Sequence, residues 1–197
     1  MRFEPLSVAG AMLVRIEPQM DRRGFFARTF CEDQFAHHGI PTEVVQANIS
    51  FNEHSGTVRG LHFQWPPSRE AKLVRCVRGR LYDVLLDLRP QSPSYLRHVA
   101  LTLDEDNRDA VFIPHGVAHG FQTLAARTEV LYQMSDFHAP ELAGGVRWDD
   151  PAFGIHWPVT QNVVISDRDA QYPDFDRPRF ESELGQHTVG ARSTAQE

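Results

Sequence analysis

The chain has few lysines, few cysteines and no long apolar run. Lys72 is the only lysine among 20 lysine and arginine residues, and Cys31 and Cys76 are the two cysteines in 197 residues. These cysteines form no metal-binding spacing, and a chain of this length does not need a disulfide. No apolar segment approaches the about 20 residues that span a bilayer. The N-terminus also lacks a signal-peptide pattern, so we expect a single cytoplasmic domain over residues 1–197.

Several functional motifs are absent as well. The sequence contains no Gly-rich phosphate loop, no dinucleotide-binding fingerprint and no Gly-x-Ser-x-Gly nucleophile elbow. Neither cysteine stands in a catalytic context. The net charge of −6 and the pI near 5.9 argue against general nucleic-acid binding, which requires a basic face.

Basic side chains are concentrated in one part of this acidic chain. Between Arg59 and Arg80 there are six lysine or arginine residues and one acid, Glu70. The same segment contains His62 and the single lysine, Lys72. Because a local positive field attracts anions whatever the net charge, this combination indicates a site for an anionic substrate that undergoes proton chemistry. The alternative is a basic surface strip produced by a preference for arginine.

Short segments separated by Gly, Pro, Asn and Asp dominate the pattern and predict strands at 8–18, 44–51, 61–65, 73–77, 82–88, 98–103, 109–113, 119–123 and 129–134. One short helix is predicted in the N-terminal half, where Thr29 and Glu32 form a possible capping box and Gly39 ends the helix. The tail 181–197 has little apolar content, and we expect it to fray. Many short strands with few helices are typical of an antiparallel sandwich or barrel.

Period-two alternation gives several predicted strands one apolar face and one polar face. The polar faces carry Gln46, Asn48 and Ser50 in one strand, His62 and Gln64 in a second, and Asp83 and Asp87 in a third. A sandwich with its polar faces in water explains the alternation. A small barrel with a polar, ligand-holding interior explains in addition why such groups recur on neighbouring strands.

Ten histidines raise the question of a metal site. The segment from Pro114 to His119 has the Pro-x-Gly-x-x-His form of the second motif of metal-binding cupins. The first cupin motif normally supplies His-x-His and a downstream Glu, whereas here only His62 is present. A catalytic metal needs about three protein ligands, so His62 and His119 alone argue against a metal site.

General acid–base chemistry fits the residues better. His62 is the natural base, because the ordinary pKa of histidine lies near neutrality. A base needs an orienting carboxylate, and the pattern alone does not rank the candidates Asp83, Asp167 and Asp169. Lys72 is either the group that holds a developing oxyanion or a solvated surface lysine. Tyr132 lies on an apolar strand face, as either a phenolic acid or a core tyrosine.

A series of motifs carries a resemblance to one enzyme family. In chain order they are Asp21-Arg22-Arg23-Gly24-Phe25-Phe26, Gln46-Ala47-Asn48-Ile49-Ser50, Arg59-Gly60-Leu61-His62-Phe63-Gln64, Ala71-Lys72-Leu73-Val74-Arg75, Asp83-Val84, Asp87-Leu88-Arg89, Ser92-Pro93, the segment from Ile113 to Phe121, Trp148-Asp149-Asp150-Pro151 and Ser166-Asp167-Arg168-Asp169. Over about residues 5 to 175 the chain resembles dTDP-4-dehydrorhamnose 3,5-epimerase and related nucleotide-sugar epimerases. The resemblance implies an all-β, cupin-like jelly-roll barrel, a homodimer, a nucleotide-diphosphate sugar as substrate, and neither a metal nor another cofactor.

The resemblance also implies roles for individual residues. His62 matches the catalytic base, Asp169 its dyad partner, Tyr132 the acid on the opposite face of the sugar, and Lys72 the residue that holds the C4 oxygen. Asp83 stays in the catalytic set as a candidate orienting carboxylate. The implied substrate-binding set is Arg23, Arg59 and His119 at the substrate and its phosphates, and Arg28, Gln46, Asn48, His138 and Arg168 towards the nucleotide. Ser50 belongs to the same substrate-binding set.

Three positions depart from the family pattern. Arg28 and Ala143 each stand where the family usually has Glu, and His138 stands where it usually has the Tyr that stacks on thymine. All three belong to the nucleotide end of the site. An arginine in place of a carboxylate exchanges an acceptor for a donor, so the nucleotide stays open, as does the choice of C3, C5 or both.

Two rival functions use the same residues. The first is a metal-dependent cupin oxygenase or isomerase that binds iron, manganese or zinc through His62 and His119. The second is a catalytically silent sugar-nucleotide binding protein built on the same barrel. The joint presence of His62, Lys72, Tyr132 and Asp169 favours the epimerase, because a binding protein needs no acid and base on opposite sides of its ligand.

Overall fold

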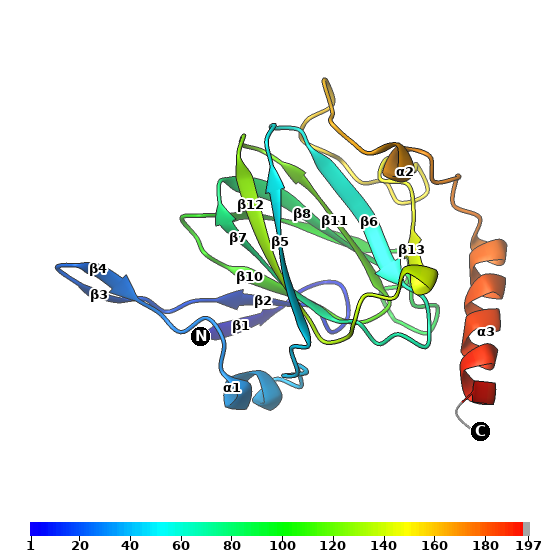
Figure 1. Cartoon of the computed structure of the whole chain (residues 1–197), viewed down its shortest axis with the longest axis horizontal. Helices are drawn as coiled ribbons and strands as arrows, with labels where there is room; N and C mark the ends of the chain where they lie inside the picture. Colours follow the sequence, from blue (N-terminus) through cyan, green and yellow to red (C-terminus); the bar gives the residue numbers. More distant parts are fainter. Residues whose placement is uncertain (195–197) are drawn as a thin grey trace.

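The computed structural model describes residues 1–194 and consists mainly of two antiparallel β-sheets (Figure 1). The six-stranded sheet has the order β1 (Arg2–Pro5), β2 (Met12–Arg15), β10 (Ala110–Ile113), β7 (Lys72–Arg78), β12 (Thr128–Met134) and β5 (Gln46–Asn52). The five-stranded sheet has the order β13 (Ala143–Gly145), β6 (Val58–Gln64), β11 (Val117–Thr123), β8 (Arg80–Asp87) and β9 (His98–Asp104). Each of the nine predicted strand segments overlaps one of these strands, whereas β1 and β13 were not predicted.

The helical segments are α1 (Glu32–His37), the 3-10 helix η1 (Pro140–Leu142), α2 (Asp167–Ala170) and α3 (Arg177–Thr194). The predicted capping box is wrong. The N-cap of α1 is Cys31, which makes no side-chain capping hydrogen bond, so Glu32 is the first helical residue instead of the third. Gly39 follows the helix as predicted, with a φ of +68° that suits glycine and an N–H that donates to the Ala36 carbonyl.

Inward-facing apolar side chains of the two sheets form a shared core. Val74 and Val111 of the six-stranded sheet pack in one buried cluster with Leu81, Leu85 and Phe121 of the five-stranded sheet. Burial of these side chains is the main stabilising contribution to folding, at roughly 1.5–3 kcal/mol for a fully buried large apolar side chain. The sheets therefore pack face to face, as in a sandwich or jelly roll.

A second apolar cluster lies on the outer face of the five-stranded sheet. Leu61 on β6 and Leu86 on β8 pack there against Phe153, Trp157 and Phe180 from the C-terminal segment. This cover explains why β6 and β8 carry an apolar face on the side that points away from the other sheet.

Helix α3 belongs to this cover. Phe180 and Leu184 pack in the outer cluster, and the imidazole of His187 stacks on Trp65 with 5.1 Å between ring centroids. The expectation of a frayed tail after Glu181 is wrong for α3, which runs to Thr194 and makes these contacts as far as His187. Residues 195–197 of that expectation lie outside the described residues.

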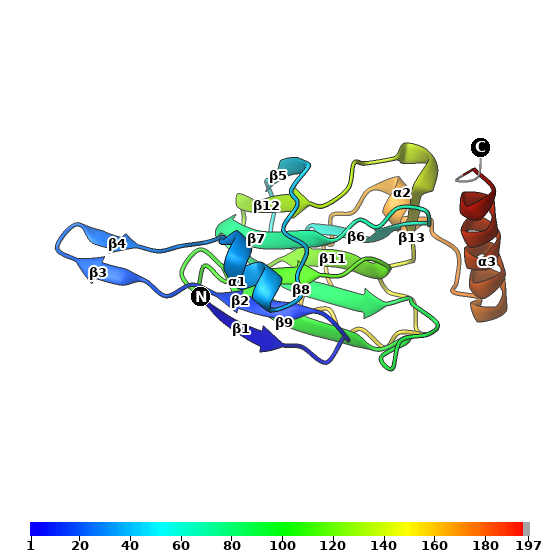
Figure 2. The ribbon, with the colours of Figure 1, turned by 90° about the horizontal axis from the view of Figure 1, so that it is seen from below.

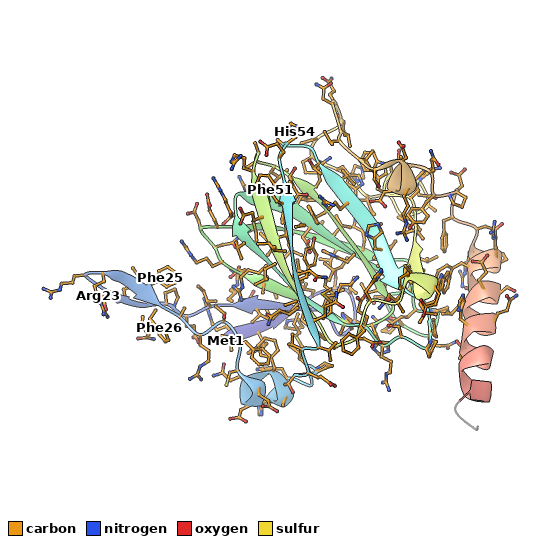
Figure 3. The ribbon with its side chains drawn as sticks, in the orientation of Figure 1. Met1, Arg23, Phe25, Phe26, Phe51 and His54 are labelled. Atoms are coloured by element: carbon orange, nitrogen blue, oxygen red, sulfur yellow. The ribbon has the colours of Figure 1, made fainter. Side chains whose placement is uncertain are left out.

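The strands β3 (Gln19–Asp21) and β4 (Gly24–Phe26) form a separate hairpin that was not predicted. The hairpin projects from the body of the molecule on the side opposite α3 (Figure 1, Figure 2). All its residues are exposed, including Met20, Phe25 and Phe26. Figure 3 shows Arg23, Phe25 and Phe26 along this projecting segment. Among the described residues, no helix is both long enough and apolar enough to cross a membrane.

Candidate active site

A cavity of about 530 Å³ opens between the two sheets. Its walls come from β5, β7 and β12 of one sheet and from β6, β11 and β13 of the other, with α2 at the side. The polar strand face of Gln46, Asn48 and Ser50 lines it, as do His62 and Gln64. The structure therefore has the polar barrel interior that the alternation favoured over a water-facing sandwich.

A histidine and an aspartate form a dyad in the cavity wall. His62 Nε2 lies 2.8 Å from Asp169 Oδ1, and Asp169 Oδ2 accepts a hydrogen bond from the Gly60 N–H at 3.1 Å. Burial raises the pKa of the Asp169 carboxyl, but the hydrogen bond and charge of His62, the Gly60 N–H and the charge of Arg168 together lower it below its usual range. An ionised carboxylate only accepts hydrogen bonds, so Nε2 donates to it, and in the neutral imidazole Nδ1 then has the lone pair that can take up a proton.

The backbone around this dyad depends on two glycines. Gly60 on β6 has a φ of +124°, and a Cβ there would lie 2.5 Å from Gly120 Cα and 2.8 Å from the His119 carbonyl oxygen. The pairing of β6 with β11 shifts register at this point, between His119 and Phe121. Glycine is thus required where the two strands approach most closely, next to His62.

A second histidine–aspartate pair lies deeper in the barrel. His119 Nε2 is 2.7 Å from Asp83 Oδ1, and both side chains are buried. Asp83, one of the three unranked candidates to orient His62, contacts His119 instead, because β8 pairs with β11. Asp167, the third candidate, begins α2 and is exposed, so Asp169 alone of the three contacts His62.

Tyr132 lies on the wall opposite His62, because β12 belongs to the six-stranded sheet and β6 to the five-stranded one. Its hydroxyl is 3.4 Å from Ser50 Oγ. Burial raises the pKa of the Tyr132 phenol well above its ordinary value, and the charge of Asp83 adds to this, while Ser50 and Arg59 act in the opposite direction. The phenol is therefore held in its protonated, proton-donating form.

Lys72 stands at the start of β7, next to β12, and lines the same cavity. Its Nζ is 3.1 Å from Oε2 of Glu70, which also lines the cavity. Lys72 is thus not a solvated surface lysine, since only 15% of its side chain is exposed. The site prediction missed Glu70, although it is the single acid of the basic segment.

Arg59 places a second fixed cation on the cavity wall. Its Nε donates to Asn52 Oδ1 at 2.7 Å, and Asn52 is itself buried. Arg168 on α2 is a third cation in the lining. Asn52 was also missed by the site prediction, and the polar alternation of its strand, in which it follows Ser50, is the signal that could have found it.

The cavity lining also contains residues expected near a nucleotide. His138 and Ala143 line it together with Gln46, whose Oε1 accepts a hydrogen bond from the His138 backbone N–H at 3.2 Å. The buried Gln64 fixes the neighbouring loop, because its Oε1 accepts from the Ala139 N–H at 2.7 Å. Two of the three departures from the family pattern therefore lie in the cavity wall.

Arg23 and Arg28 do not reach the cavity of their own chain. Arg23 lies in the turn of the projecting hairpin, 85% exposed, and its guanidinium binds Asp21. Arg28 follows the hairpin, and its guanidinium lies 3.7 Å from Cys31 Sγ. Neither arginine is part of the cavity lining described within residues 1–194, because the hairpin extends away from the barrel (Figure 3).

His62 and His119 are opposite each other in the register of β6 and β11, but each imidazole is hydrogen-bonded to a different aspartate, Asp169 and Asp83 respectively. Within residues 1–194, no group of three or more His, Cys, Asp or Glu side chains is arranged to hold a metal ion.

Comparison with known proteins decides the family. A sequence model of dTDP-4-dehydrorhamnose 3,5-epimerases matches residues 5–177. The dTDP-4-dehydrorhamnose 3,5-epimerase of Sinorhizobium fredii is 42% identical over 173 residues, which cover 88% of this chain and 89% of that protein. This chain belongs to the dTDP-4-dehydrorhamnose 3,5-epimerase family. It is therefore an isomerase that acts as a carbohydrate epimerase.

Two further relatives extend the comparison. The crystal structure of the dTDP-4-dehydrorhamnose 3,5-epimerase of Bacillus anthracis, with TDP and PPi bound, aligns with a TM-score of 0.85 at 34% identity and covers 88% of this chain and 99% of that one. A dTDP-4-dehydrorhamnose 3-epimerase of Streptomyces niveus is 38% identical over 170 residues, covering 86% of this chain and 81% of that protein. The predicted all-β, cupin-like jelly roll is confirmed, and α3 lies almost wholly beyond the residues that the family model matches.

Proposed function

We propose that this protein epimerises a nucleotide-linked 4-keto-6-deoxyhexose at C3, C5 or both, by proton transfer through an enolate. The observation that carries the proposal is one cavity with the His62–Asp169 dyad on one wall and Tyr132 and Lys72 on the other. A base and an acid on opposite walls suit the inversion of a carbon whose proton leaves from one face and returns to the other.

The chemistry needs no redox step. In a 4-keto sugar the protons on C3 and C5 lie alpha to the carbonyl. His62 Nδ1 takes one of them, the C–H electron pair becomes the C=C bond of the enolate, and the carbonyl electrons move to O4. The Lys72 ammonium stabilises the charge on O4, and the Tyr132 phenol returns a proton from the other face. General base and acid groups each contribute about 10²–10⁴-fold.

The nucleotide end of the proposed substrate is held by the cations and amides of the cavity. Arg59 and Arg168 suit the diphosphate, and Gln46 and Asn48 suit polar groups of the nucleoside. The names of the relatives make a dTDP-linked sugar the first substrate to test. His138 and Ala143 alter the wall that the family uses for thymine, so a UDP-linked sugar is the second.

We also propose that the protein works as a homodimer in which the β3–β4 hairpin of one copy reaches the cavity of the other. Arg23 and Arg28 match substrate-contacting positions of the family but lie outside their own cavity. The exposed apolar side chains Met20, Phe25 and Phe26 of the hairpin are typical of a surface buried by a partner. A second copy of the chain is the partner that would bring these arginines to a cavity.

The test of the function is solvent deuterium uptake. The purified protein is incubated in D₂O with dTDP- or UDP-linked 4-keto-6-deoxyglucose, and label at C3 and C5 is measured by NMR. We expect uptake at one or both carbons, unchanged after treatment with a chelator, and a loss of about 10²–10⁴-fold in His62→Ala. Tight binding without exchange would mean a silent binding protein. Activity that disappears on chelation and returns with added metal would mean a metal-dependent cupin enzyme.

A further inference from the structure

The chain contains a buried ion pair that the proposed mechanism does not use. Glu70 Oε2 lies 3.1 Å from Lys72 Nζ, and the exposed fractions of the two side chains are 7% and 15%. Both residues line the cavity. A carboxylate and an ammonium removed from water in this way stabilise each other, and loss of either leaves a costly unpaired charge.

The backbone holds Glu70 in this position from both sides. The Glu70 N–H donates to Ser68 Oγ at 3.2 Å, and Ser68 Oγ donates in turn to Asp136 Oδ2 at 2.8 Å. The Ala71 N–H donates to Ser135 Oγ at 2.9 Å. The turn before β7 is thus tied to the segment that follows β12, and Glu70 has little freedom to move away from Lys72.

The charges around Lys72 show why a partner is needed. Arg59 and His62 face the cavity from β6, His119 faces it from β11, and Arg168 faces it from α2. The other carboxylate in the described lining, Asp169, is already bonded to His62. Tyr132 and His138 add no fixed negative charge. An ammonium among several cationic groups would turn away from them unless a carboxylate held it.

The ion pair also leaves the ammonium able to act. A lysine ammonium has three N–H donors, and its ion pair with the single carboxylate of Glu70 does not occupy all three. Donors therefore remain for an oxygen of a ligand in the cavity. We propose that Glu70 is a positioning residue that fixes the Lys72 ammonium in the cavity so that its free N–H groups meet the oxyanion formed on the substrate. The proposal rests on the proposed function, but its structural part is measurable without substrate.

Lys72 makes that measurement simple. Because it is the only lysine of the chain, protein labelled with [¹³C,¹⁵N]-lysine gives one side-chain signal set, that of the site. In the wild-type protein we expect an ordered Lys72 side chain. In Glu70→Gln we expect its order parameter to fall below about 0.6, the range of flexible groups. A flexible Lys72 in the wild type, or equal order in both proteins, would overturn the proposal whether or not the protein is an epimerase.

Kinetics provide the second readout. The oxyanion exists only along the reaction path. Weaker stabilisation of this oxyanion by Lys72 therefore lowers kcat, while KM changes little. We expect Glu70→Gln to lower kcat for deuterium exchange by up to about 10²-fold, the cost of a misplaced catalytic group. Glu141→Gln, which removes an exposed carboxylate outside the cavity, is the matched control and should leave kcat and the lysine signal unchanged.

Three outcomes contradict a positioning role. An unchanged kcat in a folded Glu70→Gln protein means that the pair is structural only. A loss as complete as that of His62→Ala means that Glu70 itself transfers a proton. A rise in KM with kcat unchanged means that it acts in ground-state binding. If Glu70→Gln does not fold, Glu70→Asp, which shortens the carboxylate arm by one methylene, serves for both measurements.

Discussion

At the scale of single residues, two chemically identical histidine–aspartate pairs differ in their ability to act as a base on a substrate. The side chain of His62 is 41% exposed, whereas that of His119 is 5% exposed, although both imidazoles bind a carboxylate through Nε2. A base must reach its substrate, and the imidazole of His62 is by far the more accessible of the two. His119 packs edge-on near Tyr132, with 6.2 Å between ring centroids, and so helps to shape the acid side of the cavity.

Tyr132→Phe tests the separation of base and acid. Without the phenol, His62 can still remove and return a proton on its own face, but no group returns one from the other side. We expect epimerised product to fall by about 10²–10⁴-fold, while deuterium exchange with retained configuration falls less. NMR of the sugar in D₂O distinguishes the two products. Tyr95→Phe, which removes a phenol that lies outside the cavity and donates to Glu181, is the control and should preserve epimerisation. Equal loss of both processes in Tyr132→Phe would contradict the assignment.

Asp87 gives a prediction for pH. It is fully buried, and Arg89 Nε and Ser94 Oγ donate to its carboxylate at 2.8 Å and 2.6 Å. Burial raises the pKa of Asp87, but these hydrogen bonds and that of Ser92 lower it below its usual range. A depressed pKa stabilises the folded state above the ordinary Asp value of about 3.9, and this contribution is lost as the pH falls through the folded-state pKa.

Denaturant unfolding between pH 7 and pH 3 measures this effect. We expect the free energy of unfolding of the wild type to fall below about pH 5. Asp87→Asn should lower the free energy of unfolding by roughly 3–5 kcal/mol at pH 7, because the guanidinium of Arg89 is left unpaired. The free energy of unfolding of this variant should also depend less on pH. Asp149→Asn, at a half-exposed carboxylate, is the control. Parallel pH curves for wild type and Asp87→Asn would rule out this role.

At the scale of elements, period-two alternation was a reliable guide. It predicted β5 and β6 together with the side of each strand that lines the cavity, because a strand fixed between two environments must alternate. Helix α3 left no such signal. It is held by Phe180 and Leu184 against a sheet face formed elsewhere in the chain, so its stability comes from tertiary contacts that no local pattern contains. The hairpin was missed because all its residues are exposed, so no alternation of buried and exposed side chains marks it.

Gly60→Ala tests the close approach of β6 and β11. The added methyl would meet Gly120 Cα at 2.5 Å and the His119 carbonyl oxygen at 2.8 Å, and both contacts are backbone, which cannot move aside as a side chain can. We expect the overpacking to lower the free energy of unfolding by about 1–3 kcal/mol, and the positive φ to lower it by about 1 kcal/mol more. Gly154→Ala is the matched control, because Gly154 also has a positive φ but has no atom within 4 Å of the place that an added methyl would take. Thermal unfolding that gives equal losses for both variants would contradict the close-contact argument.

At the scale of the whole molecule, the site depends on residues distant in sequence. His62 and Asp169 are separated by 107 positions, and Tyr132 and Lys72 stand on strands that pair only in the folded sheet. The residue pattern therefore proposed His62 as a base but left Asp83, Asp167 and Asp169 unranked, and the family resemblance was needed to favour Asp169. The fold explains why Asp169 is the partner of His62, because α2 places Asp169 next to β6 while β8 places Asp83 next to β11.

The projecting hairpin leads to the prediction for the assembly. If Arg23 serves the cavity of a second copy, Arg23→Ala alone should lower kcat/KM by about 10- to 100-fold, the loss of one charge-assisted contact. Purified heterodimers of one Arg23→Ala chain and one His62→Ala chain should then recover roughly half of the wild-type activity, because one of the two equivalent sites of a C2 dimer has both residues intact. Differently tagged, co-expressed chains allow their isolation, and sedimentation gives the subunit number.

The reciprocal heterodimer is the control. A wild-type chain paired with an Arg23→Ala/His62→Ala chain has the same composition, but its His62 lies in a cavity that receives the altered hairpin. If the hairpins cross, this dimer should be nearly inactive while the first is half active. If each hairpin contributes to the cavity of its own chain, the results are reversed. This dimer is then half active, because its wild-type chain has a complete site, and the first dimer is nearly inactive. Such a reversal would contradict the shared site. A fully active monomer in sedimentation would contradict it as well, because in a monomer the hairpin points away from the cavity of its own chain.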